Sequence, residues 1–375
     1  MIENPFVITE KIIPGYFCDR EHESRELIKL LTNGNNVVLI SQRRIGKTGL
    51  IQFCYQQWPL NKKYTTVYVD ILSTTNLQEF TYLLGREVFD VIKRAGEGML
   101  KSFITIVKSL AAKIGFDPLT GLPSLNIQLG DIAHPDFTLK EIFTYLDNAE
   151  KPCIIAIDEF QQIRNYPERN VEALIRAHLL QINNCRMVFS GSERHILSDM
   201  FSNAAQPFYQ SAAFLELNII PKNVYVAFIQ NLFQQRRKRI SEELATQIYE
   251  MFEGITFYIQ RVCNGLFSNT EYDSKATEEI LNYTLEGILS SYNVIYRERL
   301  SRLSIRQKEL LIAIAKEKEV EKITSVEFIN KYSLASASAV QTALKSLVKN
   351  NLVVRNSDYY LVDDRFFRIW IERNY

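Results

Sequence analysis

Short apolar runs and longer amphipathic segments alternate along the first part of the chain. The runs are rich in β-branched residues and lack strict alternation with polar residues, which is typical of strands buried on both faces of a parallel sheet. They occupy residues 36–40, 65–71, 153–157, 185–189 and 213–219. The segments between them have helical spacing. The pattern therefore predicts an α/β domain over residues 1–220, with a parallel sheet flanked by helices.

One segment departs from this alternation. Residues 95–135 are richer in glycine and proline, as in the stretch GFDPLTGLPSLNIQLGDIAHP. We interpret them as an insertion, or as a long excursion between two core strands, and the pattern assigns them no function.

The strand pattern ends at Pro221. Helical spacing predicts a helical lid and a connecting helix within residues 221–299, and three more helices within residues 300–375. The predicted helices cover 223–239, 241–253, 256–267, 276–300, 305–316, 325–331 and 336–350. Two strand-like runs, 352–355 and 359–362, follow and are joined by the turn formers Asn356, Ser357 and Asp358. Three helices and a hairpin are the order of a winged helix, and the aromatic stretch 366–370 predicts a terminal helix packed onto it.

The first apolar run leads into a phosphate-binding loop. The stretch SQRRIGKTG follows a predicted strand and opens a predicted helix, which is the context that a P-loop requires. The predicted nucleotide-binding residues of this stretch are Ser41, Gln42, Arg43, Arg44, Ile45, Gly46, Lys47, Thr48 and Gly49. Backbone N–H groups and the positive end of a helix dipole would hold phosphate. A helix start with an exposed lysine is the plain alternative.

Each residue type in the loop suits one part of this chemistry. Gly46 lets the backbone approach phosphate, Lys47 reaches the β- and γ-phosphates, and the Thr48 hydroxyl can ligate Mg²⁺. Arg43 and Arg44 would contact phosphate or a neighbouring acidic residue. Ser41 stands where the usual pattern has its first glycine, so the motif is relaxed at its start.

A second motif, Asp158-Glu159, ends the third apolar run. It lies at the edge of the predicted sheet where ligands of α/β proteins collect. Asp158 would hold Mg²⁺ through water, and Glu159 would act on the attacking water as a general base or orienting residue. The alternative is a carboxylate pair that caps a helix beginning at Phe160. The P-loop upstream favours the functional interpretation.

A third motif, Ser190-Gly191-Ser192, ends the fourth run. Either hydroxyl would sense the γ-phosphate or position water between the other two motifs. Taken alone, the same residues also suit an ordinary loop and helix cap.

Together these motifs resemble the archaeal-type ATPase family, a branch of the AAA-like STAND NTPases. The resemblance rests on SQRRIGKTGL, CIIAIDEFQ, MVFSGS and AQPFYQSAAFLEL in this order, and it extends from Asn4 to Phe267. Residues 16–21 also resemble the family's Phe-x-x-Arg-Glu motif, in which Arg20 would help to form the wall of the nucleotide's base side. Residues 300–375 resemble the winged-helix domain that such ATPases often carry.

The resemblance implies a Mg²⁺-dependent ATPase switch. It assigns phosphate to Lys47, Mg²⁺ to Thr48 and Asp158, catalysis to Glu159 together with Lys47, and sensing to Ser190 or Ser192. Three positions depart from the family pattern: Ser41 replaces the first P-loop glycine, Gln210 replaces a common arginine, and Thr256 replaces the proline of Gly-x-Pro. The last two departures predict slow turnover. All three motivate an alternative, a nucleotide-binding module without hydrolysis, and an ATP-modulated DNA-binding protein is the third interpretation.

The surface of the predicted winged helix indicates which kind of partner it would contact. Val340, Leu344, Leu347 and Val348 form the expected apolar stripe of the last long helix. The residues expected to face outward are Ser338, Gln341, Thr342, Lys345 and Lys349. Residues 301–375 contain 13 basic and 9 acidic residues, a smaller excess than DNA binders usually show. Residues 300–375 are therefore expected to contact duplex DNA or a protein, with a protein partner or autoinhibition at least as well supported.

The composition and net charge narrow the classes of protein to which the chain could belong. The chain is 46% hydrophobic and 23% charged, which is typical of a globular protein. It has no run of about 18 apolar residues and no apolar core of a signal peptide near its start, so we expect no membrane contact and a cytoplasmic location. Its 44 basic and 43 acidic residues nearly cancel, and no global field points to nucleic acid. ATP or ADP is the expected ligand, and a nucleotide-dependent homo-oligomer is a further expectation.

For the cysteines and for the basic run 236–239 we expect structural roles only. The cysteines lie far apart without a Cys-x-x-Cys pair, which argues against zinc and disulfides, and Cys153 and Cys185 are expected to be buried thiols. The basic run 236–239 is expected to be the solvated end of a helix.

Overall fold

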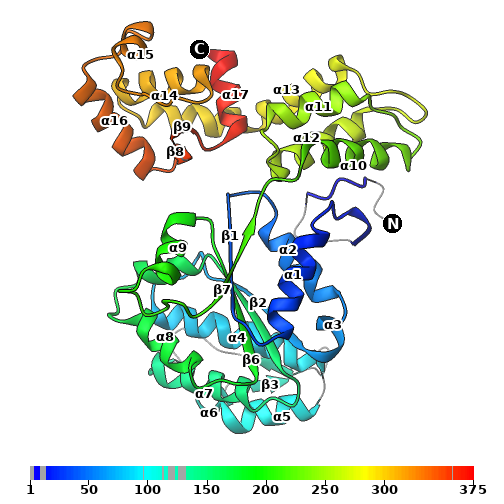
Figure 1. Ribbon diagram of the computed structural model, residues 1–375, viewed down its shortest axis with the longest axis vertical. Coiled ribbons are helices and arrows are strands. Elements are labelled where there is room, and N and C mark those ends of the chain that lie inside the picture. Colours follow the sequence, from blue (N-terminus) through cyan, green and yellow to red (C-terminus); the bar gives the residue numbers. More distant parts are fainter. Residues whose placement is uncertain are drawn as a thin grey trace. The chain divides into compact units, whose positions relative to one another are not determined.

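The computed structural model describes residues 4–8, 14–95, 97–111, 114–116, 123–125, 132–356 and 358–375. Two compact units make up the chain: Thr9–Pro221 forms one, and Met1–Ile8 together with Lys222–Tyr375 forms the other. Figure 1 labels their elements.

The Thr9–Pro221 unit is built on the predicted parallel sheet. Its strands are β1 (Val37–Ser41), β2 (Thr65–Asp70), β5 (Cys153–Asp158), β6 (Cys185–Ser190) and β7 (Ala213–Leu217). All pairings among them are parallel, and the order across the sheet is β2-β5-β6-β1-β7. The sequence prediction of a parallel α/β sheet is confirmed. The strand β6, late in the sequence, lies between β1 and β5, which brings three motif-bearing strand ends side by side.

Helices cover both faces of this sheet (Figure 1). One face packs against α4 (Leu77–Ala95), α7 (Pro135–Asp147), α8 (Val171–Leu179) and α9 (Arg194–Ser202). The other face carries α1 (Glu21–Thr32), α2 (Lys47–Gln56) and α3 (Leu60–Lys63). Because both faces are covered, the residues of β1 and β5 are all buried, which explains why their sequences read as continuous apolar runs.

The segment 95–135 lies between β2 and β5 in the sequence and adds elements to the first face. It contains α5 (Glu97–Ile106), α6 (Lys108–Ala111) and a small antiparallel pair, β3 (Ile114–Phe116) and β4 (Pro123–Leu125). The ring of Phe103 on α5 meets Tyr145 of α7 edge-on at 5.1 Å. Within this segment, residues 96, 112–113, 117–122 and 126–131 lie outside the described residues.

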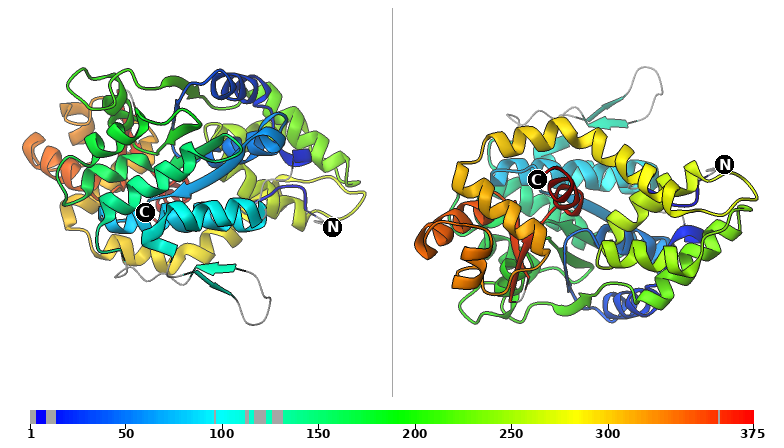
Figure 2. Two further views of the ribbon diagram at one scale, coloured as in Figure 1. Left: turned by 90° about the horizontal axis from the view of Figure 1, so that it is seen from below. Right: turned by 90° about the horizontal axis from the view of Figure 1, so that it is seen from above.

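The second unit begins with four helices: α10 (Lys222–Gln234), α11 (Glu242–Met251), α12 (Thr256–Asn269) and α13 (Glu278–Ser301). The N-terminal residues pack onto them, because the Phe6 ring lies 5.5 Å from Phe233 and the Asn4 amide donates to the Asn264 carbonyl at 2.9 Å. Figure 2 shows the long α13, which packs against both α12 and the C-terminal helix.

The basic run 236–239 differs from its prediction. The helix α10 ends at Gln234, and Arg237 adopts a left-handed conformation with φ 58°. Lys238 is only 6% exposed, and its ammonium donates to the Phe267 carbonyl at 2.7 Å and lies over the Phe267 ring. The expectation of a solvated helix end therefore holds only in part: the run follows the end of α10 and Arg237 and Arg239 are exposed, but the chain turns here and buries Lys238 against an aromatic ring.

The remaining elements have the predicted winged-helix order. They are α14 (Ile305–Glu317), α15 (Val326–Lys331), α16 (Ala337–Lys349), β8 (Val353–Asn356), β9 (Tyr359–Val362) and α17 (Arg365–Asn374). A bridge between Val320 and Tyr360 extends the hairpin, and Ser357 of its predicted turn lies outside the described residues. The predicted outward residues of α16 are exposed, and its apolar stripe is buried except for Val348, which is 38% exposed.

Two absences hold for the described part of the chain. None of its helices is long and apolar enough to cross a membrane. It also contains no cluster of three or more histidine, cysteine, aspartate or glutamate side chains arranged to bind a metal ion.

Candidate nucleotide-binding site

The predicted P-loop connects β1 to α2. The strand ends at Ser41, and the helix starts at Lys47 with Gly46 as its N-cap. Gly46 has φ 98° and Arg44 has φ 65°, so the connection bends twice through the left-handed region. A side chain at Gly46 would be strained by this backbone whatever the space around it. The unpaired N–H groups at the start of α2 therefore border the loop, as phosphate binding requires.

Ser41, which replaces the usual first glycine, is buried at the end of β1. Its hydroxyl donates to the carbonyl of Gln42 at 2.9 Å. Ile45 is buried as well, whereas Arg43 and Gly46 are exposed and Gln42, Arg44, Thr48 and Gly49 are half-buried. The loop is thus anchored at Ser41 and Ile45, and its exposed residues are Arg43 and Gly46.

Arg20 supports this loop from the segment before α1. It is 4% exposed, and its guanidinium donates to the Ile45 carbonyl at 3.4 Å and to the Glu23 carboxylate at 2.8 Å. Phe17, three residues earlier, stacks on Phe53 of α2 at 4.3 Å. The predicted Phe-x-x-Arg-Glu segment therefore lies against the P-loop and its helix.

Asp158 is the centre of a hydrogen-bond cluster at the edge of the sheet. The Thr48 hydroxyl donates to Asp158 Oδ2 at 3.0 Å, across 110 residues of sequence. The Ser190 hydroxyl donates to Oδ1 at 2.6 Å, and the Glu159 N–H donates to the same oxygen at 3.0 Å. The sheet order produces this cluster because β6 places Ser190 between the ends of β1 and β5.

Tyr68 completes the cluster and was missed by the sequence analysis. Its hydroxyl donates to Asp158 Oδ2 at 2.6 Å and lies 3.3 Å from the Thr48 hydroxyl. Burial, and after it the charge of Asp158, raises the pKa of Tyr68 above its usual range, so the phenol remains a donor. Tyr68 pairs with Ala156 in the sheet, two residues before Asp158. Nothing local marks Tyr68, because its role depends on the pairing of β2 with β5.

Lys47 is a buried cation at the start of α2. Burial lowers its pKa from the ordinary 10.5 and Arg43 lowers it further, while Asp158 and Glu159 raise it. Burial is the largest of these effects. A lysine held in this way gains most from an anion that replaces its lost hydration, and phosphate is such an anion.

Glu159 has a separate set of contacts. Its backbone is left-handed, with φ 56° and ψ 38°, and it precedes a 3-10 helix, η3 (Phe160–Asn165). Its Oε2 accepts hydrogen bonds from the Ser192 hydroxyl at 2.7 Å, the Ser192 N–H at 3.1 Å and the Gln161 amide at 2.6 Å. The side chain does not cap η3, so the helix-cap alternative does not describe it. Ser190 and Ser192 thus contact different carboxylates, a distinction that the sequence left open.

Two predicted departures from the family lie elsewhere. Gln210 is exposed just before β7, with φ 52°, and its amide donates to the Tyr209 hydroxyl at 3.1 Å. Thr256 is the first residue of α12 and follows Gly254, which has φ 74°. Gly254 and Thr256 belong to the second unit.

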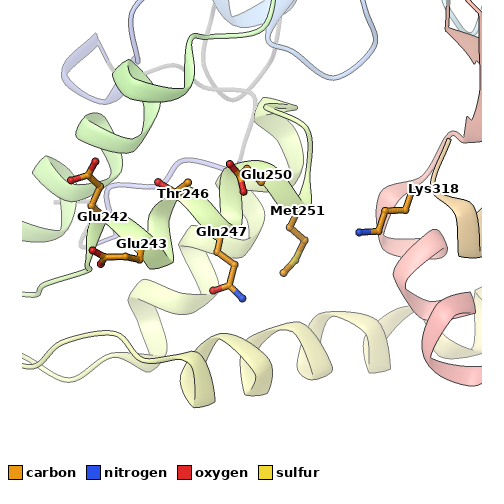
Figure 3. A pocket seen from close by; sticks show the side chains of 7 residues that line it. All are labelled: Glu242, Glu243, Thr246, Gln247, Glu250, Met251 and Lys318. Carbon is orange, nitrogen blue, oxygen red and sulfur yellow. The ribbon is translucent and has the colours of Figure 1, made fainter.

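The second unit contains a separate open cavity of about 750 Å³. Figure 3 shows its lining, with Glu242, Glu243 and Glu250 on α11 and Lys318 on the far side. None of the P-loop or carboxylate-cluster residues lines it. The candidate site is therefore defined by the converging polar groups around Lys47 and Asp158.

The strand order, the loop geometry and the carboxylate at the neighbouring strand end define a P-loop nucleotide-binding fold. Residues 17–262 match the family described as an ATPase domain predominantly from Archaea, and residues 294–373 match a probable winged helix domain. The chain therefore belongs to this family of ATPases, as the sequence motifs predicted. A comparison with curated protein sequences gives no match.

Solved structures share the fold over nearly the whole chain. The Walker-type ATPase paby2304 of Pyrococcus abyssi is 20% identical, with 98% of this chain and 99% of that chain covered and a TM-score of 0.68. The ADP form of the Aeropyrum pernix ORC2 protein is 15% identical, with 99% and 98% covered and a TM-score of 0.55. The Aeropyrum pernix ORC1 protein in complex with DNA is 12% identical, with 98% and 94% covered and a TM-score of 0.51.

Proposed function

We propose that the protein is a Mg²⁺-dependent ATPase of the AAA/STAND type that acts as a slow nucleotide switch. The observation that carries this proposal is the hydrogen bond of 3.0 Å between the Thr48 hydroxyl and Asp158 Oδ2. It joins the start of the P-loop helix to the carboxylate at the end of β5. These are the two groups between which a nucleotide-bound Mg²⁺ is held in P-loop NTPases.

The donors of this pair suit Mg²⁺. Hydroxyl and carboxylate oxygens are the ligands that this hard cation prefers, usually together with water and phosphate oxygens. Thr48 would bind the ion directly and Asp158 would bind it through water, after their mutual hydrogen bond opens. Ser190, donating at 2.6 Å, keeps the Asp158 carboxylate oriented during this exchange.

Lys47 and the P-loop amides would neutralise the β- and γ-phosphates, with Gln42, Arg43, Arg44, Ile45 and Gly49 bordering them. Glu159 is the proposed base or orienting residue for the attacking water, because its carboxylate follows Asp158 directly at the same sheet edge. Ser192, bound to Glu159, and Ser190, bound to Asp158, would report the state of the γ-phosphate through these two carboxylates. Arg20 would shape the base side of the nucleotide.

Phosphate release tests this assignment. We expect Lys47→Ala to abolish ATP binding, and Glu159→Gln to bind ATP while losing turnover by about 100-fold or more. Turnover of the parent is expected to be slow because Gln210 replaces an arginine that would contact phosphate and Thr256 replaces the proline of the family's Gly-x-Pro. Tight ATP binding without any phosphate release by the parent would instead establish the non-hydrolytic module.

We propose further that the winged helix contacts a protein partner and so reports the nucleotide state. The exposed face of α16 carries only two lysines, Lys345 and Lys349, among small polar residues. Two of the domain's arginines, Arg365 and Arg368, are buried in ion pairs with Glu253 and do not contribute to a basic surface. Duplex DNA remains the other candidate, because the Aeropyrum pernix ORC1 structure of similar fold is a complex with DNA.

A mobility shift with duplex DNA separates the two partner classes. A protein partner predicts no retardation at low salt, with or without ATP. Retardation that weakens with salt and with Lys345→Ala would establish DNA binding instead. A cytoplasmic location and a nucleotide-dependent homo-oligomer complete the proposal, and sedimentation velocity with ADP and with ATP tests the oligomer.

A further inference from the structure

The carboxylate of Glu159 is held asymmetrically. All three of its hydrogen bonds end on Oε2, two from Ser192 and one from the Gln161 amide at 2.6 Å. None of the described residues donates a hydrogen bond to Oε1. One oxygen is therefore anchored by protein groups, and the other is left for a water molecule or a ligand.

Gln161 reaches this position through the local backbone. The left-handed conformation of Glu159 turns the chain into η3, and the side chain of Gln161 returns to the carboxylate two residues before it. Gln161 is only 4% exposed. The orientation of its amide is fixed by chemistry, because a carboxylate oxygen requires the NH₂ group as a donor and would repel the amide oxygen.

This arrangement leaves the other end of the Gln161 amide unsatisfied. Its Oε1 is buried and accepts no hydrogen bond from the described residues. Burying an amide oxygen without a donor is unfavourable, and such groups call for a specific reason. Here the hydrogen bond to Glu159 is the contact that holds the amide in place.

The absence of a side chain at Gly191 leaves space for the Gln161 amide. A Cβ atom on Gly191 would lie 1.9 Å from Gln161 Oε1 and 3.0 Å from its Cδ. The backbone of Gly191 is not among those with positive φ, so its conformation alone does not require glycine. A side chain at Gly191 would therefore displace the Gln161 amide from its position beside Glu159.

We propose that Gln161 is a positioning residue for Glu159 and that Gly191 is the glycine that admits it. This inference rests on the proposed ATP hydrolysis. Gln161 and Ser192 fix Oε2, so Oε1 receives the proton of the attacking water while the water oxygen bonds to the γ-phosphorus and ADP leaves. Without Gln161 the carboxylate rotates, and the proton acceptor is misplaced in the transition state.

The test compares Gln161→Ala and Gly191→Ala with a matched control, Gln162→Ala. Gln162 is the adjacent residue of η3 and has the same side chain, but its amide donates to the Thr74 carbonyl at 2.9 Å. We expect the first two variants to lower kcat by about 10- to 100-fold, with KM and the Kd for ATP changed less than about twofold. The control should keep the parental kcat.

A double variant gives a second readout. In a Glu159→Gln background, Gln161→Ala should cause no further loss of kcat, because it acts only through Glu159. Parental kcat in Gln161→Ala, an equal loss in Gln162→Ala, or a Kd that rises in step with the loss of kcat would overturn the positioning role. If the parent and Glu159→Gln release phosphate at the same rate, the proposed function itself fails, and the positioning role fails with it.

Discussion

The Tyr68 hydroxyl donates a hydrogen bond of 2.6 Å to Asp158 Oδ2, the oxygen that also accepts from Thr48. The two residues stand on neighbouring strands, β2 and β5, and the bond ties the edge of the sheet to the proposed Mg²⁺ carboxylate. A neutral donor that keeps its proton restrains the carboxylate without competing for the cation.

Replacing Tyr68 by phenylalanine should therefore destabilise the fold. The hydrogen bond to a charged, buried acceptor predicts a loss of about 1.5–3 kcal/mol in the free energy of unfolding. The matched control is Tyr55→Phe, because the Tyr55 hydroxyl donates at 3.1 Å to the Val67 carbonyl, a neutral acceptor. Its loss should be smaller, about 0.5–1.5 kcal/mol. Urea unfolding of both variants measures the difference, and equal losses would remove the special role of Asp158 as acceptor.

The lowered pKa of Lys47 predicts a pH-dependent affinity for ATP. Phosphate binds the protonated ammonium, so the affinity is fully present below the lowered pKa and falls as pH rises through it. The decline should begin below the ordinary lysine pKa of 10.5, because burial outweighs the opposing carboxylates. Above the lowered pKa the affinity should fall by about tenfold per pH unit, as for one linked proton. Calorimetric titration with ATP measures this, and Lys47→Arg, which stays charged, should show no such decline.

Glu253 fastens the winged-helix domain to the helical lid. It accepts hydrogen bonds from Arg365 at 2.7 Å and from Arg368 at 2.8 Å, and both arginines are buried. Glu253→Gln removes the counter-charge of the buried Arg365 and one of the two carboxylates that pair with the buried Arg368, whose other partner is Glu372 at 3.7 Å. A fully buried pair would cost about 3–5 kcal/mol, and because Glu253 is 32% exposed we expect about 2–3 kcal/mol.

Thermal unfolding measures this loss of stability in the Glu253→Gln variant. Limited proteolysis within the segment between residues 253 and 365 is the second measurement. The control is Glu250→Gln, which removes an exposed pair with Lys222 whose side chains are 60% and 52% exposed. It should leave the unfolding temperature unchanged. A control variant that is destabilised as much as Glu253→Gln would show that general charge, and not the buried contact, is responsible.

The five cysteines should be unreactive in the folded protein. All are buried, and burial raises the pKa of Cys18, Cys54 and Cys153 to about 12. Thiolate is the reacting species, so little of it exists at pH 8. We expect an aromatic disulfide reagent to label the native protein slowly and all five thiols in urea. An exposed cysteine introduced by Ser338→Cys should react at once and serves as the positive control. Fast labelling of the parent would contradict the burial.

Some features of this fold depend on residues close together in the sequence, and others depend on contacts between distant residues. Strand runs, the P-loop and the helix order of the winged helix were predictable because they depend on periodicity and on residue types within a few positions. The predicted helix 223–239 was too long. The helix α10 ends at Gln234, and beyond it Lys238 contacts Phe267, which is 29 residues away in the sequence. Val348 matched the apolar spacing of α16 but lies on its exposed side.

The same distinction between local and long-range information applies to the candidate nucleotide-binding site. By itself, the sequence determined that Gly46, Lys47 and Thr48 follow a strand and that Asp158 and Glu159 end another, because each motif is contiguous. Only the tertiary structure decided that β6 lies between β1 and β5 and that β2 pairs with β5. Strand order is set by packing across the sheet, which leaves no local signal in a run of buried residues. It is this order that brings Ser190 and Tyr68 to Asp158, and Ser192 with Gln161 to Glu159.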